Sequence, residues 1–339
     1  MDKFIIYGGN RLKGQVRVSG SKNAALPVLC SAILSDGVCT FTNVPELDDI
    51  ETICRVLGHL GITCSRPEKN TVVLDPTRIS SHEAPYDLVK KMRASILVLG
   101  PLLARYGKAK VSLPGGCAIG VRPIDMHLNS LRKMGAEIDD LYKGILHCRV
   151  TRFQGTEILL DYPSVGATEN TMLAACLAQG ETVIRNAAKE PEIVDLQNFL
   201  QQMGVEIDGA GTGVIHITGR DEIRADVTYS VIPDRIVAGT YMACVAATGG
   251  VRDEPHRSLP VHLRHPGPPR DTAGVGPVVR HHRSLDVPLL RLRRERQRSD
   301  GPLRHRPGGL PAGGLRSGNR DQLFRLSRRL YAVVYDKQV

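Results

Sequence analysis

A glycine-rich segment with a cysteine near its centre carries the most specific chemical signal in the sequence. Residues 113–127 read Leu-Pro-Gly-Gly-Cys-Ala-Ile-Gly-Val-Arg-Pro-Ile-Asp-Met-His. Glycines around a thiol allow the backbone to approach a ligand closely, and the segment lacks the Gly-Lys-Ser/Thr of a nucleotide P-loop. Taken alone, the Gly-Gly-Cys turn is more typical of a buried apolar cysteine than of a reactive one. Arg122 favours Cys117 as an acid or nucleophile, because a cation lowers a thiol's pKa and also binds phosphate.

Two further cations precede apolar runs that we expect to be helices. Lys22-Asn23 opens the run 24–29, and Arg93 follows Lys90-Lys91-Met92 at the front of another. A cation opposes the macrodipole at a helix N-terminus whereas phosphate is stabilised there, so Lys22 makes most sense with an anionic ligand beside it. For both Lys22 and Arg93 the alternative is a solvated basic side chain, and the residues alone leave it open.

A small polar segment, Ser164-Val165-Gly166, comes before a third apolar run. Its hydroxyl and backbone donors suit the polar edge of a ligand, or they merely cap a helix. The histidines show no HxxxH or HxH spacing, so we propose no metal. All eight cysteines precede residue 250 without close paired spacing, which predicts buried free thiols rather than a zinc site or disulfides.

An internal repeat of about 70 residues positions these segments. Apolar helical runs end in glycine three times, and a second helix in each unit also closes at a glycine: Gly37, Gly107, Gly180, then Gly61, Gly135, Gly204. Short alternating or β-branched stretches lie between and after the two helices. The sequence therefore predicts three βαβαββ modules over residues 22–231. A fourth module begins at residue 234, and its pattern stops after Gly249.

Charge divides the 339-residue chain into two different compositions. Residues 1–250 carry 26 lysines and arginines against 27 acidic residues, so the formal net charge of +10 resides entirely in residues 251–339. Those residues hold 18 arginines, one lysine and ten of the 21 prolines. The balanced front argues against a nucleic-acid-binding domain. No apolar run reaches membrane-spanning length and the start lacks a signal-peptide core, so we expect a soluble cytoplasmic protein.

The composition of residues 251–339 is typical of a GC-rich coding sequence read in a wrong frame. We expect a frame change near residue 250 and a disordered Arg/Pro-rich tail, because such a segment buries too little apolar surface to offset its ordering entropy. The alternative is a genuine basic tail that binds nucleic acid. Such a tail normally carries lysines or interleaved aromatic residues, and this one has only Phe324, Tyr331 and Tyr335.

Several segments together resemble the UDP-N-acetylglucosamine 1-carboxyvinyltransferase family of enolpyruvyl transferases. They are residues 19–25, 84–89 with 92–95, the Cys117 loop through Asp125, 163–170, 190–195 and 233–236. The related 3-phosphoshikimate 1-carboxyvinyltransferases lack the Pro-Gly-Gly-Cys loop. The resemblance covers residues 1–250 and implies an inside-out α/β barrel in each of two domains, with the active site between them. Residues 22–231 match the complete first domain. Residues 1–21 and 232–250 match a fragment of a truncated second domain.

The resemblance also implies a reaction and a set of site residues. The family transfers the enolpyruvyl group of phosphoenolpyruvate to the 3'-hydroxyl of UDP-N-acetylglucosamine, the first committed step of peptidoglycan synthesis, without metal or cofactor. Cys117 corresponds to the proton donor, which fosfomycin labels. The expected substrate-binding residues are Lys22 and Asn23 for phosphoenolpyruvate, then Arg93, Arg122, Pro123, Ile124, Asp125, Met126, Ser164, Val165 and Gly166.

The expected partners are therefore these two small molecules, with no membrane and no specific nucleic acid. The family's aspartate general base and second-domain arginines have no counterpart in residues 251–339, so we expect this copy to be inactive. The alternatives are a non-catalytic fragment that binds UDP-sugar, or a nucleic-acid binder acting through its basic tail.

Overall fold

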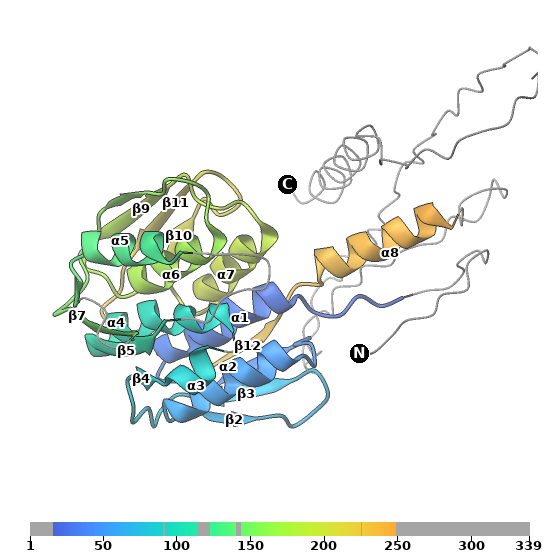
Figure 1. The fold of residues 1–339 in the computed structure, drawn as a ribbon, viewed down its shortest axis with the longest axis horizontal. Coiled ribbons are helices and arrows are strands. Elements are labelled where there is room, and N and C mark those ends of the chain that lie inside the picture. Colours follow the sequence, from blue (N-terminus) through green and yellow to red (C-terminus); the bar gives the residue numbers. More distant parts are fainter. Residues whose placement is uncertain (1–15, 91, 114–122, 140–143, 225, 249–339) are drawn as a thin grey trace, which may run out of the picture. The chain divides into compact units, whose positions relative to one another are not determined.

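The structure, a computed structural model, describes residues 16–90, 92–113, 123–139, 144–224 and 226–248. Within them, residues 17–238 form one compact unit, which contains all the sheets (Figure 1). Val16 and the part of helix α8 that begins at Gly239 belong to a second unit, most of which lies outside the described residues. The expected disordered tail, residues 251–339, also lies outside them.

Two four-stranded sheets in this unit repeat the same topology. Their orders are β4-β5-β7-β6 and β8-β9-β11-β10. In each, the first pair of strands is parallel and the other two pairs are antiparallel. The strands are β4 (Glu83–Ala84), β5 (Lys108–Ser112), β6 (Glu137–Ile138), β7 (Ile145–Arg149), β8 (Glu157–Leu159), β9 (Glu181–Arg185), β10 (Glu206–Asp208) and β11 (Val214–Thr218).

The remaining sheet has the same topology but draws its first strand from the far end of the unit. Its order is β12-β1-β3-β2, with β12 (Val227–Ser230), β1 (Cys39–Thr42), β3 (Val72–Asp75) and β2 (Thr63–Ser65). β12 runs parallel to β1 with Cys39 opposite Val227. The first module therefore differs from the predicted strand-first pattern. The residues before its first helix pair with residues 232–234 instead, where Ser21 N donates to Ile232 O at 2.7 Å.

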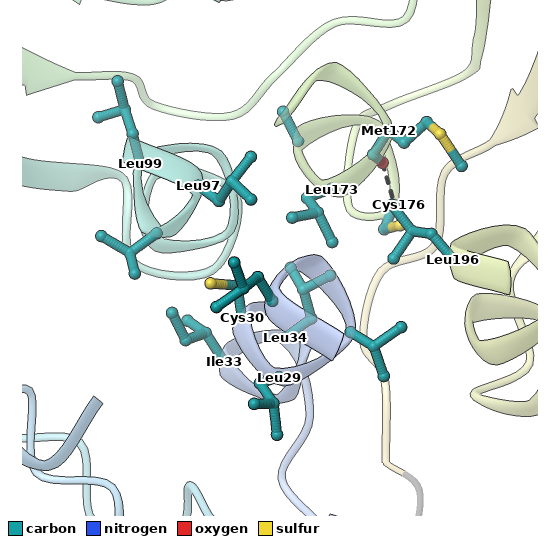
Figure 2. Packing of buried hydrophobic residues seen from close by; sticks show 14 of the residues in the cluster. Leu29, Cys30, Ile33, Leu34, Leu97, Leu99, Met172, Leu173, Cys176 and Leu196 are labelled. Atoms are coloured by element: carbon teal, nitrogen blue, oxygen red, sulfur yellow. Dashed lines mark hydrogen bonds between the residues drawn. The ribbon is translucent and has the colours of Figure 1, made fainter. Parts of the chain in front are cut away.

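Helices fill the interior between the sheets. The buried ones are α1 (Lys22–Ser31) with the 3-10 turn η1 (Ala32–Leu34), η2 (Arg93–Val98) with α4 (Leu99–Tyr106), and α6 (Val165–Ala175). Figure 2 shows Cys30 of α1, Leu97 of η2 and Leu173 of α6 among the buried side chains where these three helices meet. Burying an aliphatic side chain of this size contributes about 1.5–3 kcal/mol. Because the strands alternate buried and more exposed residues, one face of each sheet covers the helices. This is the predicted inside-out α/β arrangement.

The second helix of each module is amphipathic, and all three end as predicted. They are α2 (Asp48–His59), α5 (Asp125–Lys133) and α7 (Pro191–Gln202). The short α3 (Tyr86–Val89) lies between β4 and η2. Each long helix is followed by a glycine with positive φ: Gly61 at 101°, Gly135 at 107° and Gly204 at 85°. An L-residue with a side chain is strained in that conformation, whereas glycine adopts it freely.

The glycine ends predicted for the first helices need correction. Gly107 does terminate α4 in the left-handed conformation, with φ 68°. In contrast, α1 ends at Ser31 and continues as η1, and α6 ends at Ala175, five residues before Gly180. The Arg105 side chain donates instead to Ile33 O at 2.8 Å and Ser35 O at 2.6 Å, which satisfies carbonyls beyond α1 without a glycine.

Helix α8 (Arg235–Ala247) lies where the fourth module was expected to begin, and Ala238 is its one buried residue. Its first turn is capped by Asp234 Oδ1, which accepts from Ile236 N at 2.7 Å and Val237 N at 3.1 Å. Across the described ranges, no helix is long and apolar enough to cross a membrane. Seven described cysteines are free, and five of them are buried: Cys30, Cys39, Cys54, Cys148 and Cys176.

Candidate functional site

Arg93 connects two of the predicted substrate-binding segments. It is the first residue of η2. Met92, the residue before it, has an extended backbone and ends the connection from α3. Its Nη2 donates to Pro123 O at 2.9 Å. Pro123 leads into Ile124, which is buried, and then into the first turn of α5, where Asp125 is exposed and Met126 is buried. A carboxylate is stabilised by the helix dipole in that position. The 3-10 segment and the start of α5 are therefore held together at residue 93.

The segment 164–166 joins this group through α5. Ser164 caps α6, with its Oγ accepting from Ala167 N at 3.4 Å, so the capping role considered from the sequence is realised. Gly166 packs against the His127 ring. A Cβ built on Gly166 would lie 3.1 Å from His127 Cε1 and 3.2 Å from Nε2. A larger residue at 166 would press on the imidazole, so glycine is what allows α5 and α6 to approach here.

A buried polar pair lies behind these segments. Asn170 Nδ2 is 3.2 Å from His127 Nδ1, and the two side chains are almost completely buried. Burial and, to a smaller extent, the positive charge of Arg93 lower the pKa of the His127 imidazole to about 4, against a raising effect of Asp125. The imidazole is therefore neutral at neutral pH.

Lys22 and Asn23 lie at the N-terminus of another helix, α1. Lys22 Nζ forms an ion pair with Asp49 Oδ2 at 2.7 Å, and both side chains are about one-third exposed. Asp49 is in the acidic first turn of α2. Asn23 is exposed, and Ser21 caps α1 by accepting from Ala24 N. The Lys22 charge thus has a carboxylate partner in the protein, which the sequence did not indicate.

The structure brings together Arg93, Pro123 to Met126 and Ser164 to Gly166, and places Lys22 and Asn23 on a separate helix. Cys117 and Arg122 lie outside the described residues. Within the part of the chain that is described, no three histidine, cysteine or acidic side chains gather in a way that could hold a metal ion.

Buried acids near residues 190–195 connect α7 to the end of the unit. Glu192 accepts from Arg235 Nε at 3.1 and 3.2 Å. Tyr229 donates its hydroxyl to Asp195 Oδ1 at 2.6 Å. Burial raises the pKa of Asp195 to about 7, against the lowering effect of the Tyr229 hydrogen bond. Burial also holds the pKa of Glu169 well above its usual range. These contacts fix α7 to β12 and the start of α8.

Comparison with known proteins identifies the family. The sequence matches the family described as EPSP synthase (3-phosphoshikimate 1-carboxyvinyltransferase) over residues 6–253. The chain belongs to this family. Its fold is also that of the enolpyruvyl transferase NikO from Streptomyces tendae, with a TM-score of 0.62 and 24% identity, covering 70% of this chain and 56% of NikO. That likeness concerns the fold alone.

Curated relatives in this family confirm the more specific resemblance. UDP-N-acetylglucosamine 1-carboxyvinyltransferase of Idiomarina loihiensis is 55% identical over 251 residues, 74% of this chain and 59% of the relative. The protein of the same name from Desulforapulum autotrophicum is 56% identical over 250 residues, with the same coverage. The chain spans about three fifths of the length of these relatives.

Sequence reasoning assigned no role to Asn170 or His127, although both occur in the segments it used. A polar residue at a position that the helical pattern makes fully buried was the available signal, since such residues are rarely left without partners. Gly100 also received no role. A Cβ built there would lie 2.4 Å from Asn170 Oδ1.

Proposed function

We propose that the protein binds UDP-N-acetylglucosamine on the described unit, as part of a site for enolpyruvyl transfer from phosphoenolpyruvate to the sugar 3'-hydroxyl. The observation that carries this proposal is the meeting of Arg93, the 123–126 segment and the 164–166 segment. The names of relatives at about 55% identity supply the substrate and the reaction. The proposal includes a role in peptidoglycan synthesis and a cytoplasmic location.

The local chemistry suits a nucleotide diphosphate. Arg93 provides a guanidinium, and helices α5 and α6 both begin at this group, so their first backbone N–H groups and dipoles favour an anion. Ser164 Oγ already satisfies Ala167 N. The N–H groups of Val165 and Gly166 lie in the first turn of α6, where a helix lacks internal acceptors.

In this proposal phosphoenolpyruvate is bound by Lys22, Asn23 and Arg122, and Cys117 donates the proton to its methylene carbon. The addition needs cations for the phosphate and an acid for the carbon. Lys22 would then contact the phosphate, either in place of Asp49 or together with it. A direct check is fosfomycin labelling of an intact homologue that carries this front sequence. We expect Cys117→Ser to abolish labelling, and undiminished labelling would contradict the role of Cys117.

We further propose that residues 22–231 are one domain of three βαβαββ units, and that residues 1–21 and 232–250 contribute to another. Residues 251–339 do not continue the repeat. They contain no counterpart of the family's aspartate general base or of its second-domain arginines. Without those groups, positioning and charge stabilisation of phosphoenolpyruvate are incomplete. We therefore infer that the 339-residue chain binds UDP-N-acetylglucosamine without releasing phosphate.

Calorimetric titration of the full chain with UDP-N-acetylglucosamine tests the binding proposal. We expect saturable binding that Arg93→Met weakens strongly, with Arg55→Met as the matched control because Arg55 is an exposed arginine on α2. Absence of binding by the wild-type chain, or equal effects of the two substitutions, contradicts the proposal.

A phosphate-release assay tests the inference about turnover. Phosphate release from phosphoenolpyruvate that depends on UDP-N-acetylglucosamine would contradict it. The nucleotide sequence around codon 250 offers a second check, since a one-base insertion or deletion there should restore further 70-residue repeats.

The basic tail supports a second candidate function, nucleic-acid binding. All of the excess positive charge lies in residues 251–339. Titration with single-stranded DNA at several salt concentrations distinguishes the two candidates. Steep salt dependence that disappears on deletion of 251–339 favours the tail, because phosphate contacts release counterions.

A further inference from the structure

The Asn170 side-chain amide makes contacts with three elements at once. Its Oδ1 accepts from Gly100 N of α4 at 2.8 Å, and its Nδ2 donates to Ile96 O of η2 at 3.2 Å. The same Nδ2 lies 3.2 Å from His127 Nδ1 of α5. Asn170 itself belongs to α6 and is fully buried. One side chain thus links the elements that carry Arg93, Asp125 and Gly166.

These backbone partners leave the amide only one orientation. A backbone N–H can only donate and a carbonyl oxygen can only accept, so the amide oxygen must face Gly100 and the amide nitrogen must face Ile96. The nitrogen therefore also faces His127 Nδ1, and Nδ1 must accept. The imidazole proton is consequently on Nε2. If Nδ1 were also protonated, its N–H would point at the amide N–H of Asn170. This repulsion adds to burial and to the charge of Arg93 in favouring the neutral imidazole.

The Nε2–H group that results is held against Gly166. Among the described residues Nε2 is buried without a hydrogen-bond partner. It lies so close to Gly166 that a Cβ on that residue would crowd it. A buried donor without an acceptor is costly, so its persistence in a native fold calls for a reason. The adjoining segments are those expected to bind the nucleotide sugar.

We propose that Asn170 is a positioning residue of the nucleotide-sugar site: it holds the segments of Arg93, Asp125 and Gly166 in register and fixes His127 as the neutral tautomer with its proton on Nε2. This inference rests on the proposed binding of UDP-N-acetylglucosamine. Asn170 acts through its neighbours, and no contact with the ligand is required of it.

The substitution Asn170→Asp tests the proposal with nearly unchanged shape. A carboxylate can still accept from Gly100 N, but it cannot donate to Ile96 O or to His127 Nδ1. We expect the His127 proton to move to Nδ1, which nitrogen-15 NMR of the imidazole resolves. We also expect the affinity for UDP-N-acetylglucosamine to fall about tenfold or more, as loss of a buried hydrogen bond of roughly 1.4 kcal/mol would give.

The matched control is Thr171→Val. Thr171 is the next residue of α6, is equally buried, and donates its hydroxyl to Ala167 O at 2.7 Å within the same helix. We expect this variant to keep the Nε2–H tautomer and to bind the ligand within about twofold of wild type, because it loses a buried hydrogen bond that joins no other element.

The outcomes separate this inference from the proposed function. If wild type binds the ligand and Asn170→Asp binds it equally tightly, or if Thr171→Val is impaired as much, the positioning role is overturned. If Asn170→Asp does not fold, the wild-type spectrum decides: an Nε2–H tautomer whose nitrogen-15 resonance shifts when UDP-N-acetylglucosamine is added supports the proposal, and an Nδ1–H tautomer or an unresponsive ring overturns it. If the wild-type chain does not bind the ligand at all, the proposed function fails, and the tautomer still reports whether the amide is oriented as described.

Discussion

Two helical glycines, Gly100 in α4 and Gly58 in α2, meet opposite surroundings. A Cβ at Gly100 would lie 2.4 Å from Asn170 Oδ1 and 2.5 Å from Asn170 O, whereas at Gly58 nothing lies within 4 Å. We expect Gly100→Ala to destabilise the protein by about 1–3 kcal/mol through overpacking. Gly58→Ala should stabilise it by up to about 1 kcal/mol through helix propensity. Urea denaturation measures both, and a shift of the same sign in the two variants would contradict the packing argument.

Asp195 predicts a pH-dependent stability. Its pKa is raised from 3.8 to about 7, so between these values the unfolded carboxyl ionises while the folded one keeps its proton. The folded state therefore binds more protons, and this residue's contribution to stability falls as pH rises from about 4 to 7. The destabilisation that comes from ionising this buried carboxyl is absent below about pH 4 and reaches its full size above about pH 7.

Asp195→Asn removes the ionisation and keeps an acceptor for Tyr229. We expect the variant's stability relative to wild type to rise between pH 4 and pH 8 by a few kcal/mol, since one pKa unit corresponds to about 1.4 kcal/mol. Thermal or urea unfolding at several pH values measures the difference. A difference that stays constant with pH would show that the folded carboxyl is not perturbed.

The role of a single residue could be predicted from the sequence where its partner lies a few positions away along the chain. Ser164 was recognisable as a helix cap because a cap bonds to a backbone N–H three residues away. The partner of Lys22 was not, since Asp49 reaches it from another helix. The Asn170 contacts were equally hidden, because Ile96 lies 74 residues away along the chain.

Among the elements, one arginine connects the last turn of α4 to the end of η1. Arg105 is mostly buried, donates to Ile33 O and Ser35 O, and forms an ion pair with Asp36. Arg105→Met keeps the apolar stem and leaves two carbonyls without this donor. We expect a loss of about 1–3 kcal/mol in the free energy of unfolding.

Arg152→Met is the matched control for that measurement. Arg152 also pairs with an aspartate, Asp221 at 2.6 Å, but both side chains are substantially exposed. Water screens such a pair and solvates its partner after substitution, so little change is expected. If the two arginine variants lose similar stability, the carbonyl contacts of Arg105 contribute nothing beyond its ion pair.

The repeat also shows where element-level prediction succeeds and fails. Helix ends that require a left-handed residue, such as Gly107 and Gly135, are visible in sequence because glycine is needed there. After α1 the chain continues as η1, whose Ile33 O accepts from Arg105 about 70 positions later, so the glycine at 37 misled the prediction. Periodicity locates an element, and tertiary contacts decide its last turn.

For the whole unit, β12 is expected to be indispensable. It supplies the parallel neighbour of β1, and its Tyr229 packs on Phe199 with ring centroids 5.2 Å apart while Phe199 packs on Phe41 at the same distance. A chain ending at residue 226 loses these contacts, whereas one ending at 248 keeps them. We expect the longer chain to be folded and the shorter one to lose cooperative unfolding, as followed by circular dichroism. Equal cooperativity would show that the sheet tolerates an unpaired β1.

The pairing of β12 with β1 also sets an order of events in time. Cys39 and Val227 are 188 positions apart, so during synthesis β1 leaves the ribosome long before its neighbour exists. At roughly 5–20 residues per second that interval is about 10–40 seconds. The two later sheets take their first strands from their own modules and can form meanwhile, while one edge of β1 stays open to other chains. The first sheet is therefore the last to be completed, and that edge of β1 stays unpaired until β12 has been synthesised.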